Sequence, residues 1–136
     1  MKAIIFAAGL GTRLRPLTND RPKALVEVGG VAMLEHVIKR LINYGINEIV
    51  INIHHFGDKI IEFVKAKNNF GITIHISDER DLLLDTGGGI LKARKWLDGN
   101  EPIIIHNADI LTDFDLHKMV KQHVDNNADA TLLVAD

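Results

Sequence analysis

An α/β fold, built on a doubly wound and mostly parallel sheet in three α/β/α layers, is predicted by three features of this sequence. The hydrophobic period switches repeatedly between a strand-like and a helix-like repeat, which is typical of alternating strands and helices. The strand-like segments are short, rich in Ile and Val and mostly continuous in apolar character, as in strands buried on both faces. No Pro/Gly/Ser-rich linker divides the chain, so we expect one domain.

The first half of the chain is expected to begin with strand, helix, strand and helix. Residues 3–7 form an apolar run that leads directly into a glycine-containing loop, as a first core strand does. Apolar residues recur at helical spacing over 34–42, and Gly45 supplies a stop signal. Residues 48–53 form the second predicted strand, and 60–64 mark the second helix. This alternation is that of a parallel sheet with helical crossovers.

The second half is expected to continue the same alternation. Residues 72–76 are predicted as the third strand, and 90–97 carry a helical pattern that is opened by glycines. Residues 103–106 form the fourth predicted strand, 116–123 a fourth helix and 130–134 a fifth strand. The expected arrangement is Rossmann-like with strand order 3-2-1-4-5, in which ligands bind beyond the carboxyl ends of the strands.

The composition is that of a globular domain without an extended charged surface. Hydrophobic residues make up 46%, charged residues 25%, and the net charge is −2. No block of five or six like charges occurs, so we expect neither a nucleic-acid nor a membrane partner. The absence of cysteine excludes disulfides and thiolate catalysis. Because the first apolar run is too short for a signal peptide or a membrane span, the cytoplasm is the expected compartment.

A loop with glycines and basic residues follows the first predicted strand. Gly9 and Gly11 allow backbone N–H groups to approach a triphosphate without a Cβ in the way. Thr12 adds a hydroxyl donor, and Arg13 a forked cation suited to phosphate oxygens. Lys23 directly follows a proline, which stiffens the backbone there, and offers a point charge for a phosphate. The pattern therefore predicts a phosphate-binding loop.

This loop resembles the signature of the sugar-1-phosphate nucleotidylyltransferase family. Residues 9–18 read Gly-x-Gly-Thr-Arg-Leu-x-Pro-Leu-Thr, and residues 22–26 read Pro-Lys-x-Leu-Val. The match begins at Met1 and extends along the chain. The resemblance implies that the loop backbone cradles an NTP, and that Arg13 and Lys23 meet the phosphates of the NTP and of a sugar 1-phosphate.

A second segment, residues 84–89, reads Leu-Asp-Thr-Gly-Gly-Gly at the start of the third predicted helix. Three consecutive glycines cost conformational entropy, which indicates that something needs a close approach to the backbone. The resemblance implies that this segment lies along the base and ribose of the nucleotide. The string is most similar to that of uridylyltransferases acting on N-acetylmuramate 1-phosphate, and mannose-1-phosphate guanylyltransferases carry a related version.

A third motif places an acidic residue after a buried strand. Asp109 follows the apolar run 103–105 closely, and a carboxylate there is a hard oxygen ligand where Mg²⁺ on a triphosphate would sit. The alternative is an aspartate that caps a turn. The resemblance implies the metal role, although the family usually has a glycine where this chain has Ala108. Mg²⁺ is therefore the expected cofactor and Asp109 its ligand.

The expected reaction transfers a nucleoside monophosphate from an NTP, UTP or GTP by preference, to a sugar 1-phosphate. Arg13, Lys23 and Asp109 are the expected catalytic residues. The residues expected to bind the nucleotide are Ala8, Gly9, Leu10, Gly11, Thr12, Arg13, Lys23, Thr86, Gly87, Gly88 and Asn107.

Two alternatives compete with this enzyme. A dinucleotide-binding oxidoreductase is disfavoured because Leu14 stands where the fingerprint needs its third glycine. A nucleotide-binding regulatory relative without turnover stays open. Members of the family are longer and supply a second metal aspartate from their C-terminal part. Residues 1–136 are thus expected to be the nucleotide-binding part of a truncated domain, which binds nucleotide weakly and catalyses poorly.

Overall fold

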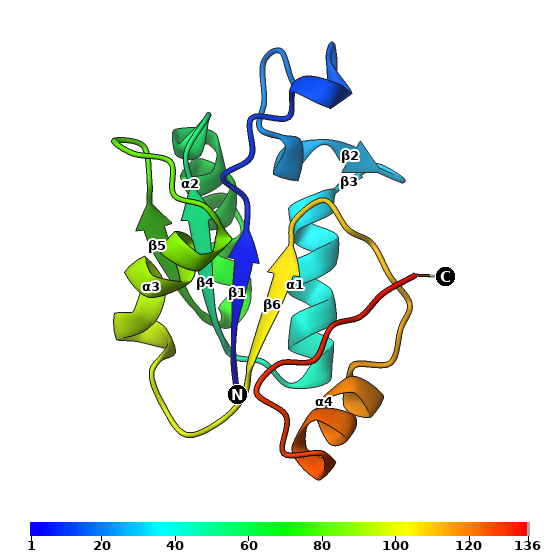
Figure 1. The fold of residues 1–136 in the computed structure, drawn as a ribbon. Helices are drawn as coiled ribbons and strands as arrows, with labels where there is room; N and C mark the ends of the chain where they lie inside the picture. Colours follow the sequence, from blue (N-terminus) through cyan, green and yellow to red (C-terminus); the bar gives the residue numbers. More distant parts are fainter. Residues whose placement is uncertain (136) are drawn as a thin grey trace.

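A four-stranded parallel sheet forms the centre of the molecule in the computed structural model, which describes residues 1–135. Its strand order is β5-β4-β1-β6, and every neighbouring pair is parallel (Figure 1). The strands are β1 (Lys2–Phe6), β4 (Glu48–Ile53), β5 (Thr73–Asp78) and β6 (Ile103–Asn107). The α/β class and the predicted order of the first four strands are therefore confirmed.

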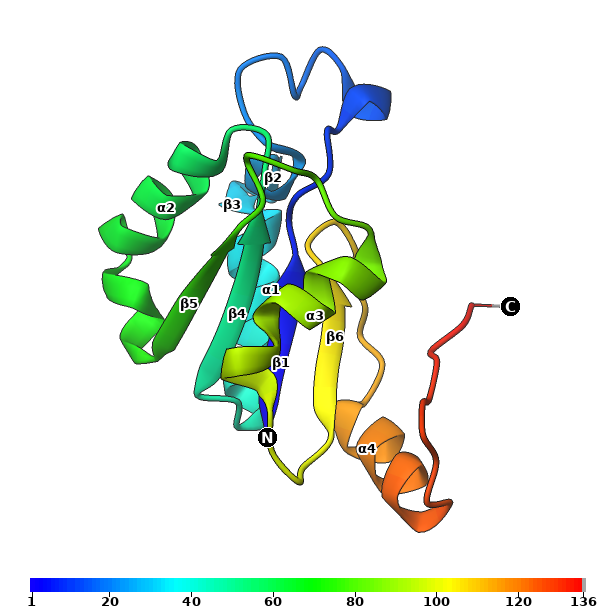
Figure 2. The same cartoon turned by 60° about the vertical axis from the view of Figure 1, so that its left-hand side comes forward.

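Helices cover both faces of this sheet. Helices α1 (Met33–Tyr44) and α2 (Gly57–Ala66) pack on one face, and α3 (Thr86–Leu97) lies across the other (Figure 2). Helix α4 (Leu116–Asp125) lies beyond β6 and contributes Leu116 to the core on the α1 side. All four predicted helices are present, and the three-layer arrangement is confirmed.

Alternating side chains of the inner strands divide the core into two parts. Ala3 and Ile5 of β1 pack on the α1 and α2 side, whereas Ile4 meets Val50 and Ala93 on the α3 side. Since both faces of β1 and β4 are covered, both sets of side chains are buried away from solvent. This is the physical reason for the continuous apolar runs that predicted the strands.

Local signals set the ends of the elements. Gly45, with φ 112°, ends α1, and its N–H donates to the carbonyl oxygens of Ile42 and Leu41. Between β1 and α1 the chain forms a short antiparallel hairpin of β2 (Glu27–Val28) and β3 (Val31–Ala32). Its two-residue turn is Gly29-Gly30, both with positive φ, as favoured hairpin turns require. The sequence pattern did not predict this hairpin.

The predicted fifth strand, residues 130–134, is wrong. This segment has no strand in the structure, and its chain stands apart from β6 (Figure 2). The side chains of Leu132 and Val134 are 84% and 75% exposed. An apolar run marks a segment that can pair, but a strand forms only where a neighbouring edge receives its hydrogen bonds. Within the described residues β6 is hydrogen-bonded to β1 alone.

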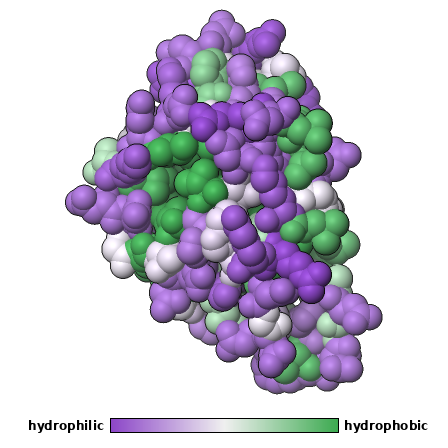
Figure 3. All heavy atoms as spheres, turned by 90° about the vertical axis from the view of Figure 1, so that its left-hand side faces the viewer, coloured by the Kyte–Doolittle hydropathy of each residue, from purple (hydrophilic) through white to green (hydrophobic). Residues whose placement is uncertain are grey.

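The side of the molecule that carries β5 is mostly hydrophilic, with apolar side chains in several areas, of which the largest lies left of the centre (Figure 3). The core is contacted by the isoleucines of β5, Ile74 and Ile76, and by the aromatic rings of Phe63 and Phe70. No described helix combines the length and the apolar character needed to cross a bilayer. The predicted compartment stays a prediction.

Candidate functional site

The loop after β1 combines a buried beginning with an open tip. Ala7 and Ala8 are buried, whereas Gly9 and Leu10 are exposed, and a Cβ on Gly9 would meet open space. Gly11 has φ 67°, and a Cβ there would lie 3.0 Å from the Cγ2 atom of Thr18. The Thr18 hydroxyl donates a 2.6 Å hydrogen bond to the Gly11 carbonyl. The loop is thus closed at Gly11, while Gly9 leaves room beside the backbone.

Lys23 and Asp109 meet at the carboxyl end of the sheet. A short 3₁₀ turn, η2 (Lys23–Leu25), follows Pro22 and presents the lysine, and the Lys23 Nζ atom contacts Oδ2 of Asp109. The two side chains are 29% and 33% exposed, so both can still be reached from solvent. Two of the three expected catalytic residues therefore form one ion pair, although they come from opposite ends of the sequence.

Arg13 lies apart from this ion pair. It belongs to the short 3₁₀ turn η1 (Thr12–Leu14) and is exposed, as is Thr12 before it. Within the described part of the chain Arg13 forms no salt bridge. The expected phosphate contact thus depends on a side chain that no ion pair holds in the described part of the chain.

The end of β6 brings Asn107 and Asp109 to the same edge of the sheet. Asn107 is exposed and lies opposite Phe6 in the parallel register, directly before the loop that follows β1. The N–H of Ala108 donates to the Phe6 carbonyl at 3.0 Å, and its methyl group is buried in the core. Because this N–H is already used, Ala108 in place of glycine removes no backbone donor from the site.

The N-terminus of α3 is the third part of the candidate site, beside the loops that follow β1 and β6. Asp85 is the N-cap residue, Thr86 and Gly87 are exposed, and a Cβ on Gly87 would meet open space. The first N–H groups of a helix have no intrahelical acceptor and favour negative charge. Gly88 is more confined, since a Cβ there would lie 3.1 Å from the Cβ of Leu84.

Two buried polar residues that connect these segments were not predicted from the sequence. Asn52 and Glu79 are 2% and 0% exposed and are hydrogen-bonded to one another. The available signal was one polar residue, Asn52, within the otherwise apolar second half of β4. A polar side chain in such a strand is buried and needs a partner.

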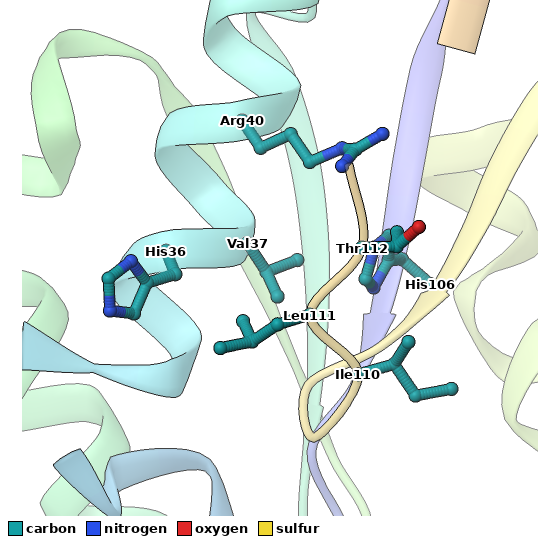
Figure 4. A pocket seen from close by; sticks show the side chains of 7 residues that line it. All are labelled: His36, Val37, Arg40, His106, Ile110, Leu111 and Thr112. Carbon is teal, nitrogen blue, oxygen red and sulfur yellow. The ribbon is translucent and has the colours of Figure 1, made fainter. Parts of the chain in front are cut away.

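A pocket of about 310 Å³ lies beside α1 under the loop that follows β6, but it contains none of the expected site residues (Figure 4). Its lining consists of His36, Val37, Arg40, His106, Ile110, Leu111 and Thr112. Arg40 donates to the Phe114 carbonyl, and His106 Nδ1 lies 2.7 Å from the Asn107 carbonyl oxygen. We place the candidate site at the open strand ends because the glycine turns and the Lys23–Asp109 pair meet there.

The stability of the protein is expected to depend on pH through His106, which lies near the end of β6. Burial first, and then the nearby charge of Arg40, hold the pKa of His106 below its ordinary value, against an opposing backbone hydrogen bond. The unfolded chain therefore binds more protons below about pH 6.5. The contribution of neutral His106 to stability is fully present above that pH and is lost as the pH falls toward the folded-state pKa.

We expect the free energy of unfolding to fall between about pH 8 and pH 5 more steeply for the wild type than for His106→Gln. Urea unfolding at intermediate pH values measures the difference. His117→Gln serves as the control, since that side chain is 75% exposed. Parallel curves for wild type and His106→Gln would contradict the assignment.

The residues present fit a metal ion only in part. No group of three or more His, Cys, Asp or Glu side chains with metal-binding geometry occurs among residues 1–135. Asp109 is one partly exposed carboxylate beside the lysine, and Mg²⁺ is commonly held by one or two carboxylates together with substrate phosphates. The donor set thus suits a metal that arrives with a nucleotide rather than one held by the protein alone.

Comparison with known proteins shows which family the sequence matches. The family model described as nucleotidyl transferase matches residues 2–136. An N-acetylmuramate alpha-1-phosphate uridylyltransferase of Caulobacter vibrioides is 48% identical over 109 residues, covering 79% of this chain and 45% of that protein. A probable mannose-1-phosphate guanylyltransferase 3 of Oryza sativa subsp. japonica is 35% identical over 136 residues, covering 98% of this chain and 38% of that protein.

A solved structure shares the fold. The crystal structure of HddC from Yersinia pseudotuberculosis complexed with GMP-PN superposes with a TM-score of 0.80 at 29% identity. The match covers 91% of this chain and 54% of that one. This chain thus spans less than half the length of the two curated relatives and about half that of the solved structure.

Proposed function

This chain belongs to the nucleotidyl transferase family, and from that premise we propose that it forms the nucleotide-binding part of a sugar-1-phosphate nucleotidylyltransferase. The reaction transfers a nucleoside monophosphate from an NTP to a sugar 1-phosphate and releases pyrophosphate. The observation that carries the proposal is the contact of Lys23 with Asp109 beside the open glycine loop. A cation and a metal-binding carboxylate at one strand edge are what two phosphate-bearing substrates require.

The chemistry needs positioning and charge neutralisation more than a nucleophilic side chain. A sugar 1-phosphate is ionised at neutral pH, because the second pKa of a phosphate monoester is about 6. Its oxygen can attack the α-phosphorus of the NTP in line, with pyrophosphate as the leaving group. In this proposal Lys23 bridges the phosphates of the two reactants, and Arg13 stabilises the pyrophosphate. Asp109 is the residue that would hold Mg²⁺, which would further neutralise the triphosphate.

Lys23 and Asp109 neutralise one another in their ion pair. The phosphates of a nucleotide would offer the lysine a new partner, and Asp109 would then be free to hold a metal ion. The exposed tip of the glycine loop and the N-terminus of α3 offer the remaining backbone donors for the nucleotide.

UTP is the first choice of nucleotide and GTP the second. A uridylyltransferase and guanylyltransferases are among the relatives that this chain resembles. A second candidate function is nucleotide binding without turnover. It is favoured by the single carboxylate that contacts Lys23 within the described residues.

Thermal unfolding with UTP, GTP, dTTP, CTP and ATP, each with and without Mg²⁺, tests the proposal. A ligand bound only by the native state stabilises it by about 2.7 kcal/mol at 100 times its Kd. We expect a selective shift with one nucleotide, enhanced by Mg²⁺, and loss of that enhancement in Asp109→Asn. No shift with any nucleotide would contradict nucleotide binding by this chain.

Addition of a sugar 1-phosphate then separates the two candidate functions. Pyrophosphate release that depends on the sugar phosphate supports the transferase. Nucleotide binding without release supports the binding relative.

A further inference from the structure

Two polar side chains are buried between the sheet and α3, where apolar packing is the rule. Asn52 lies on β4 and is 2% exposed, and Glu79 follows β5 and is fully buried. Glu79 forms no salt bridge within residues 1–135. Burial of such groups is unfavourable unless their hydrogen bonds are satisfied. Their partners therefore indicate what they do.

Those partners lie in two separate loops. The N–H of Ala7 donates to Oδ1 of Asn52 at 2.7 Å, and Nδ2 of Asn52 donates to Oε1 of Glu79 at 3.1 Å. The N–H of Leu84 donates to Oε2 of Glu79 at 3.2 Å. Ala7 begins the glycine loop after β1, and Leu84 directly precedes the N-cap residue of α3. A chain of three hydrogen bonds, two buried and one partly buried, thus ties the two loops together.

The packing of α3 follows the same pair. A Cβ on Gly89 would lie 3.0 Å from Oε1 of Glu79, 3.0 Å from Cε1 of Phe6 and 3.4 Å from Nδ2 of Asn52. A side chain at this position would push α3 away from the buried pair. The third consecutive glycine is therefore explained by contact with Glu79, whereas Gly87 faces open space.

We propose that Asn52 and Glu79 are positioning residues that fix the glycine loop relative to the N-terminus of α3, and so set the affinity for the nucleotide bound between them. The inference rests on the proposed function, in which the loop holds the phosphates and α3 the base and ribose. Neither side chain touches the nucleotide in this scheme. They act through Ala7 and Leu84.

The direction of each hydrogen bond provides a sharp test. A glutamine at position 79 has one acceptor and one donor group, but the site offers it two donors, so Glu79→Gln leaves one donor–donor contact. Asn52→Asp places two acceptors against one another. The double variant Asn52→Asp with Glu79→Gln restores all three bonds, because the new glutamine donates to the new aspartate and accepts from the N–H of Leu84. The double variant also keeps one buried carboxylate, which moves from position 79 after β5 to position 52 on β4.

Amide hydrogen exchange measured by NMR tests the connection without any nucleotide. Each single variant breaks the hydrogen bond between residues 52 and 79, and we expect exchange at Ala7 or Leu84 to increase about tenfold because the two loops lose that connection. The double variant is expected to return both amides to wild-type protection. Unchanged exchange at both amides in both single variants would refute the connection, as would a double variant no better protected than the single ones.

Nucleotide affinity tests the functional part. We expect the Kd of the preferred nucleotide with Mg²⁺ to rise about tenfold in each single variant and to recover in the double variant. Ile60→Val is the matched control, since Ile60 is fully buried on the opposite face of the sheet. A similar loss of affinity in Ile60→Val would mean that general destabilisation causes the effect, and would overturn the positioning role.

The two failures are distinguishable. If the wild type binds no nucleotide, the proposed function fails, while the exchange data still decide whether Asn52 and Glu79 hold the two loops together. If the wild type binds and the single variants bind equally well, the positioning role fails and the proposed function stands.

Discussion

Lys23→Ala is expected to lower the rate of pyrophosphate release by about 100-fold or more while leaving the fold intact. Removing one preorganised charge-stabilising donor from a transfer site commonly costs this much. The stability change is expected to be about 1 kcal/mol or less, because the Lys23–Asp109 pair is partly exposed and such pairs contribute little to folding. The rate of sugar-phosphate-dependent pyrophosphate release and the urea midpoint measure the two effects separately.

Lys39→Ala is the matched control for this prediction. Lys39 also forms an ion pair, with Glu35 on α1, but its side chain is 60% exposed and belongs to a helix away from the glycine loop. We expect near-normal release in this variant. Near-normal release in Lys23→Ala as well would remove Lys23 from the catalytic residues.

The alternation of strands and helices was largely predictable from the sequence, because burial determines both the pattern and the fold. Strand 48–53 is rich in apolar residues since the sheet is covered on both faces there, whereas Ile105 in the equally apolar run 103–106 is 48% exposed. The same signal failed at residues 130–134. Their apolar character says that they can be buried, but not which edge or surface receives them.

The candidate site was predictable in type but not in geometry. Glycines and basic residues marked the loop after β1, and strand order placed Asp109 at the same edge. The contact of Lys23 with Asp109 could not be predicted, because it depends on how the long connection between β1 and α1 folds back. The hydrogen bond between Asn52 and Glu79 could not be predicted either, because it depends on the register in which β4 and β5 pair.

The hydrogen-bonded pair Asn52–Glu79 lies on the α3 side of the sheet, near the carboxyl ends of the strands. The larger apolar core lies on the α1 and α2 side. A core substitution on that side should thus change stability with little effect on the geometry of the site.

Leu41→Ala is expected to destabilise the protein by about 2–5 kcal/mol, the range for a large-to-small change in a packed core. Leu41 is fully buried on the face of α1 that meets the sheet. For a domain of this size, a loss in the middle of that range lowers the Tm by roughly 10 °C. Urea and thermal unfolding measure the change.

Leu91→Ala supplies the comparison, because it makes the same chemical change on a helix of the opposite face at a side chain that is 71% exposed. Its expected effect is within about 0.5 kcal/mol, as for most surface substitutions. Equal losses in the two variants would contradict a dominant effect of burial, since alanine is at least as good a helix former as leucine and propensity cannot cause the loss. A large loss in Leu41→Ala alone, with nucleotide affinity retained at a temperature where the variant is folded, would establish that the α1 side supports the fold without shaping the site.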